Sequence, residues 1–121
     1  MYTGSVYTPN KTKDYEEWIK QSFFIKYPKF DIITNRVKIE IIAYLKIPKS
    51  TSKKMAEKML DDEISPLKKP DIDNIAKVVL DAINNYVIKD DIQVSKMSVE
   101  KKYSENEKLI IKIEEYWKKA K

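Results

Sequence analysis

The segment from Arg36 to Ile47 alternates apolar and polar side chains, and this pattern constrains the fold more than any other feature of the sequence. A period of two residues is that of a β-strand with one face buried and the other exposed to water. Such a strand must belong to a sheet that other elements cover on one side. The apolar series is Val37, Ile39, Ile41, Ala43, Leu45 and Ile47, and the polar side carries Lys38, Glu40 and Lys46.

The sequence on either side of this segment shows three helical patterns and two further strand patterns. Residues 1–11 are polar and are expected to form turns. Two more strands, at 92–103 and 108–117, are expected to pair as an antiparallel hairpin. The sequence therefore predicts one α+β domain over residues 1–121, with helices packed on one face of a small mixed or antiparallel sheet. The predicted helices run from Lys13 to Tyr27 after a Thr12 cap, from a Ser50 or Thr51 cap to about Asp61 with Met55, Met59 and Leu60 inward, and from about Asn74 to Asn84.

Composition removes most catalytic chemistries. The chain has no histidine and no cysteine, which excludes His-based acid–base catalysis, thiolate nucleophiles, disulfides and Cys- or His-ligated zinc. A single glycine, Gly4, is too few for a dinucleotide fingerprint or a phosphate-binding loop. The net charge of +5 is compatible with a nucleic-acid partner. The remaining chemistry must use carboxylates, lysines, hydroxyls or a metal bound by oxygen ligands.

Aspartates concentrate between positions 71 and 91, where five of the nine in the chain lie. If the tripeptide after Pro70 is extended, Asp71 and Asp73 point to the same side while Ile72 points to the core. Two carboxylates held close together repel each other unless a cation or a proton lies between them. Because Mg²⁺ prefers oxygen ligands and is usually bound by one or two carboxylates, it is the natural ion for this pair.

Asp90 and Asp91 are expected to enter the next strand and to supply a third carboxylate. Neighbouring residues of a strand face opposite sides. Ile92 is expected in the core, and Asp90 shares its face. The alternation therefore favours Asp91 as the side chain that joins the first pair.

Lys77 is the last residue of the candidate site. Asp73, Lys77 and Asp81 are spaced four apart on the third predicted helix and therefore share one face. The Lys77 ammonium then lies one turn from the carboxylates, where it can contact a scissile phosphate. Simpler interpretations stay open for each feature. Asp73 can be a helix cap, and Asp73, Lys77 and Asp81 can form an exposed ladder of ion pairs. Asp90 and Asp91 can be turn residues, and the basic face of the second helix can simply face water.

The residues from Lys69 to Ile83 read K-P-D-I-D-N-I-A-K-V-V-L-D-A-I, and those from Lys89 to Val94 read K-D-D-I-Q-V. Together they closely resemble the RusA family of Holliday junction resolvases. That family shows K/R-P-D-x-D-N-x-x-K-x-x-x-D-A-L, followed shortly by D-D-x-Q-V. The similarity is strongest from 68 to 97, and the flanking segments agree more loosely.

The resemblance implies a small homodimeric endonuclease that depends on Mg²⁺, for which Mn²⁺ can substitute, and that resolves four-way DNA junctions by paired symmetric nicks in recombination and repair. Such proteins are often encoded by phages and prophages. The essential aspartates of the family fall on Asp71, Asp73 and Asp91 and its essential lysine on Lys77, while Asp90 and Asp81 match supporting positions. Asp90 joins the expected metal ligands. The expected DNA-backbone contacts are Lys49, Lys53, Lys54, Lys58, Lys68 and Lys69.

One departure and one rival function accompany this assignment. Family members usually begin with an extra strand and a basic loop before the Tyr7-Thr8-Pro9 segment, and this chain is expected to lack both. A non-catalytic module that binds branched DNA is the alternative function, and a nuclease with a broader range of branched substrates is a third. The sequence shows no signal peptide and no membrane span, so a cytoplasmic protein without a membrane partner is expected.

Overall fold

A computed structural model describes residues 2–5 and 12–115 of the chain. Most of the predicted elements are confirmed to within two residues. The turn predicted for residues 1–11 is wrong at 2–5, which form a short strand, and the rest of that segment lies outside the described residues. No helix in the described part is long and apolar enough to cross a membrane. The elements are β1 (Tyr2–Ser5), α1 (Thr12–Lys26), β2 (Val37–Lys46), α2 (Lys53–Leu60), α3 (Ile72–Ile83), the 3₁₀ turn η1 (Asp91–Gln93), β3 (Val94–Ser104) and β4 (Lys108–Glu115).

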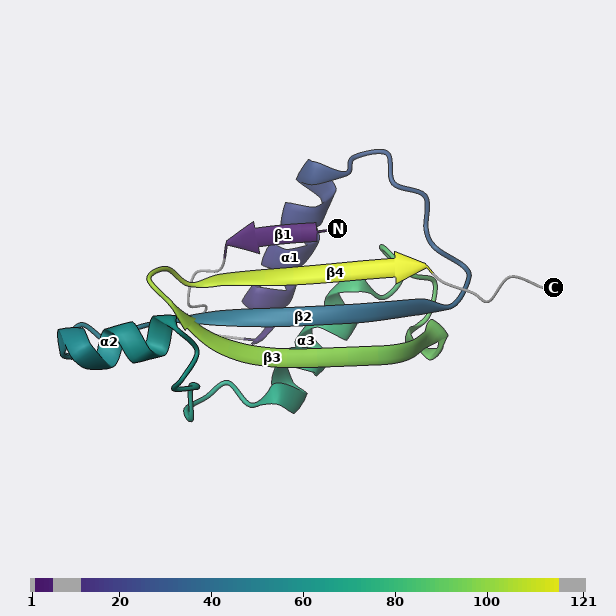
Figure 1. Cartoon of the computed structure of the whole chain (residues 1–121). Coiled ribbons are helices and arrows are strands. Elements are labelled where there is room, and N and C mark those ends of the chain that lie inside the picture. The colour runs from purple at the N-terminus through teal and green to yellow at the C-terminus, as the bar shows by residue number, and fades with distance from the viewer. Residues whose placement is uncertain (1, 6–11, 116–121) are drawn as a thin grey trace.

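The four strands form one mixed sheet in the order β1-β4-β2-β3 (Figure 1). The predicted hairpin of the last two strands is wrong, because β2 lies between them. It pairs parallel with β3 and antiparallel with β4. Ile47 N–H also donates to the carbonyl of Ser104 at 3.1 Å, so β2 stays paired with β3 to the end of both strands. The central strand of a sheet is its most buried position, and the regular apolar series of β2 suits that place better than an edge.

Helices α1 and α3 cover one face of the sheet (Figure 1). The alternation of β2 has the predicted sense, since Val37, Ile39, Ile41 and Ala43 are all buried. They join the apolar stripes of the two helices in a single core. Among the described residues no element covers the other face of the sheet, called the open face below. It carries cross-strand ion pairs, Lys38 to Glu114 and Lys112 to Glu40. The remaining buried residues are Ile19, Phe23, Ile75, Val79, Ala82, Ile83, Val87, Ile88, Leu109 and Ile111.

Helix α2 extends beyond one end of the sheet and contains no buried residue (Figure 1). The predicted inward series of Met55, Met59 and Leu60 is therefore wrong, since Met55 and Leu60 are exposed and Met59 is only half-buried. The cap is Ser52, whose hydroxyl accepts a hydrogen bond from Met55 N–H at 3.3 Å. An amphipathic pattern records which residues could be buried together, but this short helix has no neighbouring surface on which to bury them.

Candidate active site

The acidic motif begins as a helix rather than as an extended segment. Asp71 is the N-cap of α3, its carbonyl accepts from Ile75 N–H at 3.0 Å, and Asp73 lies in the first turn. The predicted extended tripeptide with an inward Ile72 is wrong, because Ile72 is the first helical residue and is 49% exposed. Carboxylates favour the positive end of the helix dipole, which explains the early start.

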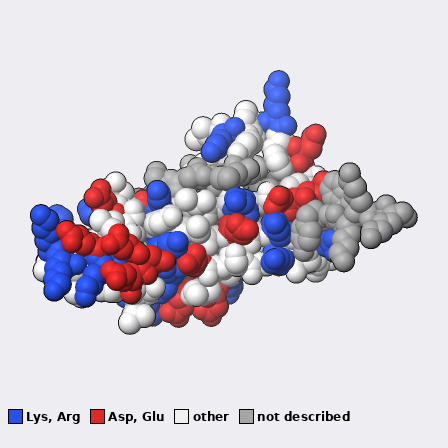
Figure 2. Space-filling model, in the orientation of Figure 1, with Lys and Arg blue, Asp and Glu red and all other residues white. Residues whose placement is uncertain are grey.

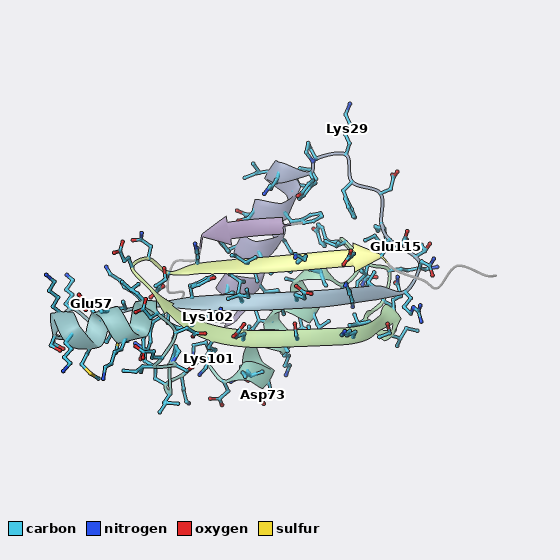
Figure 3. All side chains as sticks on the ribbon, in the orientation of Figure 1. Lys29, Glu57, Asp73, Lys101, Lys102 and Glu115 are labelled. Atoms are coloured by element: carbon cyan, nitrogen blue, oxygen red, sulfur yellow. The ribbon has the colours of Figure 1, made fainter. Side chains whose placement is uncertain are left out.

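Asp71 caps the helix through its backbone alone, because its side chain makes no capping hydrogen bond. The alternative that Asp73 is the cap is therefore wrong. Both aspartates are exposed. Figure 3 shows Asp73 at the start of α3, below the edge of the sheet formed by β3 in that view. Two carboxylates thus remain available at this end of the helix.

Lys77 and Asp81 continue along the exposed side of α3, at the predicted spacing of four residues. Within the described residues, no ion pair joins Lys77 to Asp73 or to Asp81. The salt-bridge ladder considered as the simpler interpretation of this series is therefore not formed. Lys77 is an exposed ammonium that no carboxylate of the described chain neutralises.

The second acidic pair lies in the turn η1 rather than in a strand. Ile92 is 85% exposed, so the prediction that it enters the core, and with it the alternation argument for Asp91, is wrong. The backbone instead forms a 3₁₀ turn closed by a capping box. The Asp90 carboxylate accepts from Ile92 N–H at 3.3 Å. The Asp90 carboxylate is therefore committed to the turn, whereas the capping box does not use the Asp91 side chain.

Gln93 fixes this turn, a role that sequence reasoning missed. Its Oε1 accepts from Asp90 N–H at 2.8 Å, and its Nε2 donates to the carbonyls of Ile33 and Asn35 at 2.8 and 2.7 Å. One side chain thus joins the acidic turn to the segment before β2. The signal was present, because an Asp followed three residues later by Gln is the spacing of a capping box.

Negative charge accumulates around Asp91. A hydrogen bond with the Asp90 side chain raises the pKa of Asp91 above its ordinary value, and desolvation and the charges of Asp90 and Asp81 act in the same direction. Like charges disfavour ionisation of a carboxyl group. The negative charges of Asp90 and Asp81 therefore both act on Asp91.

The three predicted ligands, Asp71, Asp73 and Asp91, do not form one cluster among the described residues. Asp73 and Asp81 are eight residues apart on one helix, which corresponds to about 12 Å along its axis. In the described part of the chain, no three acidic side chains come together closely enough to hold a metal ion. The donor type suits Mg²⁺, but the described part of one chain does not gather the predicted ligands into a metal-binding group.

The predicted DNA-contacting lysines are all exposed. Lys53, Lys54 and Lys58 lie on α2, and Lys49 lies in the turn before it. Figure 2 shows basic side chains over this end of the molecule, with acidic ones beside them. Lys68 and Lys69 lie in the connector to α3, which is tied to β3 by a 2.7 Å hydrogen bond from Lys101 Nζ to the Lys68 carbonyl.

Comparison with known proteins identifies the family. The endodeoxyribonuclease RusA family matches residues 2–114 of the chain. The chain is also similar to a Bacillus subtilis (strain 168) protein described as uncharacterized protein YqaN, with 37% identity over 109 residues. That alignment covers 88% of this chain and 76% of YqaN. The family match spans helix α3, the anchoring Gln93 and the four strands of the sheet up to Glu114. This chain therefore belongs to the RusA family of endodeoxyribonucleases, which act on branched DNA junctions.

Proposed function

We propose that the protein is a Mg²⁺-dependent endonuclease that resolves four-way DNA junctions by paired nicks, as a homodimer. The observation that carries this proposal is the set of exposed carboxylates on α3 and η1, within a segment that lies inside the family match. The chain has no histidine or cysteine that could supply another route to hydrolysis. Carboxylates that hold a metal ion are then the simplest means of cutting a phosphodiester.

Asp71, Asp73 and Asp91 are the proposed metal ligands, with Asp90 in support. The chemistry that Mg²⁺ supplies in such sites is activation of water and stabilisation of charge on the phosphate. Because Asp71 and Asp73 lie at the start of α3 while Asp91 lies beyond its end, we propose that each site combines Asp71 and Asp73 of one chain with Asp91 of the partner subunit. The excess negative charge around Asp91 supports a cation there.

Lys77 is the proposed positive charge at the scissile phosphate. It follows Asp73 by one turn of α3, is exposed, and pairs with neither neighbouring aspartate. An ammonium in this position stabilises negative charge that develops on the phosphate oxygens. It needs no change of protonation to do so.

Two-fold symmetry relates the proposed dimer to its substrate. A four-way junction presents equivalent strands, and an isologous dimer presents two equivalent sites to them. The lysines of α2 and of the connector are proposed to contact the phosphate backbone, which fixes orientation without reading sequence. Recognition would then depend on junction shape and on salt.

A synthetic mobile junction incubated with and without Mg²⁺ tests the function. We expect symmetric nicks only with the metal. Asp73→Asn should lower the nicking rate more than about 100-fold while junction binding stays equal or tightens, because a charge that repels the phosphates is removed. Asp31→Asn, which changes an exposed aspartate outside the motif, is the matched control. Normal cutting by Asp73→Asn would show that the site is wrong, and binding without cutting by the unmodified protein would favour a non-catalytic module.

Mixing two inactive variants tests whether the site is shared. In a mixed dimer of Asp73→Asn with Asp91→Asn, one shared site carries both defects and the other carries none. Random subunit exchange should therefore restore single nicks at about a quarter of the normal rate. If each site lay within one chain, both sites of the mixed dimer would be defective and no activity would return.

A further inference from the structure

Strand β3 forms a long open edge of the sheet. It contains 11 residues and, within the described chain, pairs only with β2 (Figure 1). One side of its backbone is therefore free to pair with another strand. Proteins usually protect such an edge with a short strand, charged side chains, a proline or a covering element, because an open edge is a ready template for further pairing. The 11 residues include no proline. Their charged side chains, Lys96, Glu100, Lys101 and Lys102, are of both signs, so the register decides whether they oppose pairing.

Exposed apolar side chains lie near both ends of this edge. Ile92, just before β3 begins, is 85% exposed. Leu67 is 96% exposed and lies in the connector that Lys101 ties to the C-terminal half of β3. A two-fold axis across the middle of the edge would exchange the two ends. Ile92 of each copy would then approach the connector of the other, where it could bury its side chain.

We propose that two copies of the chain associate by antiparallel pairing of their β3 strands, about a two-fold axis through Ser98. In this register Lys96 lies opposite the partner subunit's Glu100, and Met97 lies opposite the partner subunit's Val99. Residues that are directly opposite in an antiparallel pair project from the same face of the sheet. The two sheets join into one across the dimer.

The faces of β3 support this register. Lys96, Ser98 and Glu100 are level with Lys38, Glu40 and Ile42 of β2, which belong to the open face. Met97 and Val99 are level with Ile39 and Ile41 and pack against the core. The pairing therefore places opposite charges next to each other on the open face and apolar side chains next to each other on the face that the helices cover.

Two alternative registers, with the axis nearer the C-terminal end of β3, set like charges opposite each other. An axis through Val99 sets Lys96 opposite the partner subunit's Lys102, and an axis through Glu100 sets that carboxylate against its own copy. Like charges directly opposite one another destabilise a strand pair. Glu100 already contacts Lys102 at 3.9 Å, but the Glu100 side chain is 55% exposed and Lys102 also pairs with Asp62 at 3.8 Å. The Glu100 carboxylate can therefore form a second ion pair, with the partner subunit's Lys96.

The interface also bears on the shared site, and this one consequence rests on the proposed function. Antiparallel pairing sets the start of each β3 beside the end of the other. The turn η1 with Asp91 then lies on the same side as the partner's connector, which leads into the start of α3. The pairing itself requires no catalytic activity.

Cysteine cross-linking tests the register directly, because the chain has no cysteine of its own. Ser98→Cys lies on the proposed axis, and two such residues fall within the separation of about 4.4–6.8 Å between Cα atoms that a disulfide needs. We expect a covalent dimer on mild oxidation. Lys96→Cys is the control, because its two copies would be four residues apart, or about 13 Å. Mixing Lys96→Cys with Glu100→Cys should restore the cross-link. Failure of Ser98→Cys to cross-link, or equal cross-linking of Lys96→Cys alone, would overturn the register.

Charge reversal tests the same interface without a covalent bond. Lys96→Glu should weaken dimerisation roughly tenfold in Kd, measured by analytical ultracentrifugation, because two attractive cross-strand pairs become repulsive. Adding Glu100→Lys in the same chain should restore the Kd. An unchanged Kd for Lys96→Glu would contradict the interface. A protein that cuts junctions but does not cross-link refutes the interface alone, whereas one that cross-links but never cuts refutes the proposed function alone.

Discussion

Asp90 and Gln93 hold each other through both backbone and side chain. The Asp90 N–H donates to Gln93 Oε1 at 2.8 Å, and the Asp90 carboxylate closes the same turn by accepting from Ile92 N–H. The Nε2 of Gln93 continues the network to two carbonyls of the segment before β2. The acidic turn is therefore anchored by one amide side chain, and its neighbour Asp91 is positioned by this anchor.

Changing Gln93 to Glu should loosen the turn. The substitution keeps the shape but removes both Nε2 donors and places a carboxylate beside two carbonyl oxygens. We expect the free energy of unfolding to fall by about 1–3 kcal/mol, measured by urea denaturation. Gln21→Glu, an exposed position on α1, is the matched control and should change stability by less than about 0.5 kcal/mol. Equal effects of the two substitutions would contradict the anchoring role.

Replacing Asp91 with Asn should stabilise the fold at neutral pH and abolish nicking. Since the pKa of Asp91 is raised in the folded state, its ionisation opposes folding, and stability falls as pH rises through the interval between the unfolded and folded pKa values. The Asp91→Asn variant does not ionise at this position and therefore keeps the stability that the unmodified protein loses. Its melting temperature should exceed that of the unmodified protein at pH 7 and match it at about pH 3, where the carboxyl is protonated in both states. A lower melting temperature at pH 7 would contradict this account.

Removing the charges of α2 should weaken DNA binding without affecting stability. Helix α2 buries no residue, so substitution of Lys53, Lys54 and Lys58 by Ala should leave the core intact. If all three contact phosphates, the slope of log affinity against log salt should become shallower by up to about three units. Lys29→Ala, which changes a lysine at a distant corner of the molecule (Figure 3), should leave the slope unchanged. An unchanged slope in the triple variant would place the DNA elsewhere.

The two faces of the sheet should differ in their tolerance of truncation. Ile111 is completely buried beneath the helices, whereas its neighbour Ile110 is half-buried on the open face. Ile111→Ala should cost about 2–5 kcal/mol of stability, and Ile110→Ala less than about 1.5 kcal/mol. Thermal or urea unfolding of both variants measures the difference. Similar costs would mean that the open face is covered in the native protein.

Composition and the aspartate motif by themselves specified much of the candidate site. The amino-acid sequence excluded histidine and cysteine chemistry, located the acids and Lys77, and pointed to the family that the comparison confirms. The buried face of β2 was also correct, because a period of two residues determines which side chains share a face. These features are local, and local pattern is what a sequence expresses directly.

Only the tertiary structure decided which segments become neighbours. β2 lies between β3 and β4, and β1 forms where the free edge of β4 offers backbone partners, although its four residues carry no pattern of their own. The same limit applied to the site. Ile92 has the character of a core residue, yet the capping bonds of Asp90 and Gln93 turn the chain at that point and leave Ile92 exposed. Strand order and the separation of the acids at the two ends of α3 depend on contacts between distant segments, which no local periodicity encodes.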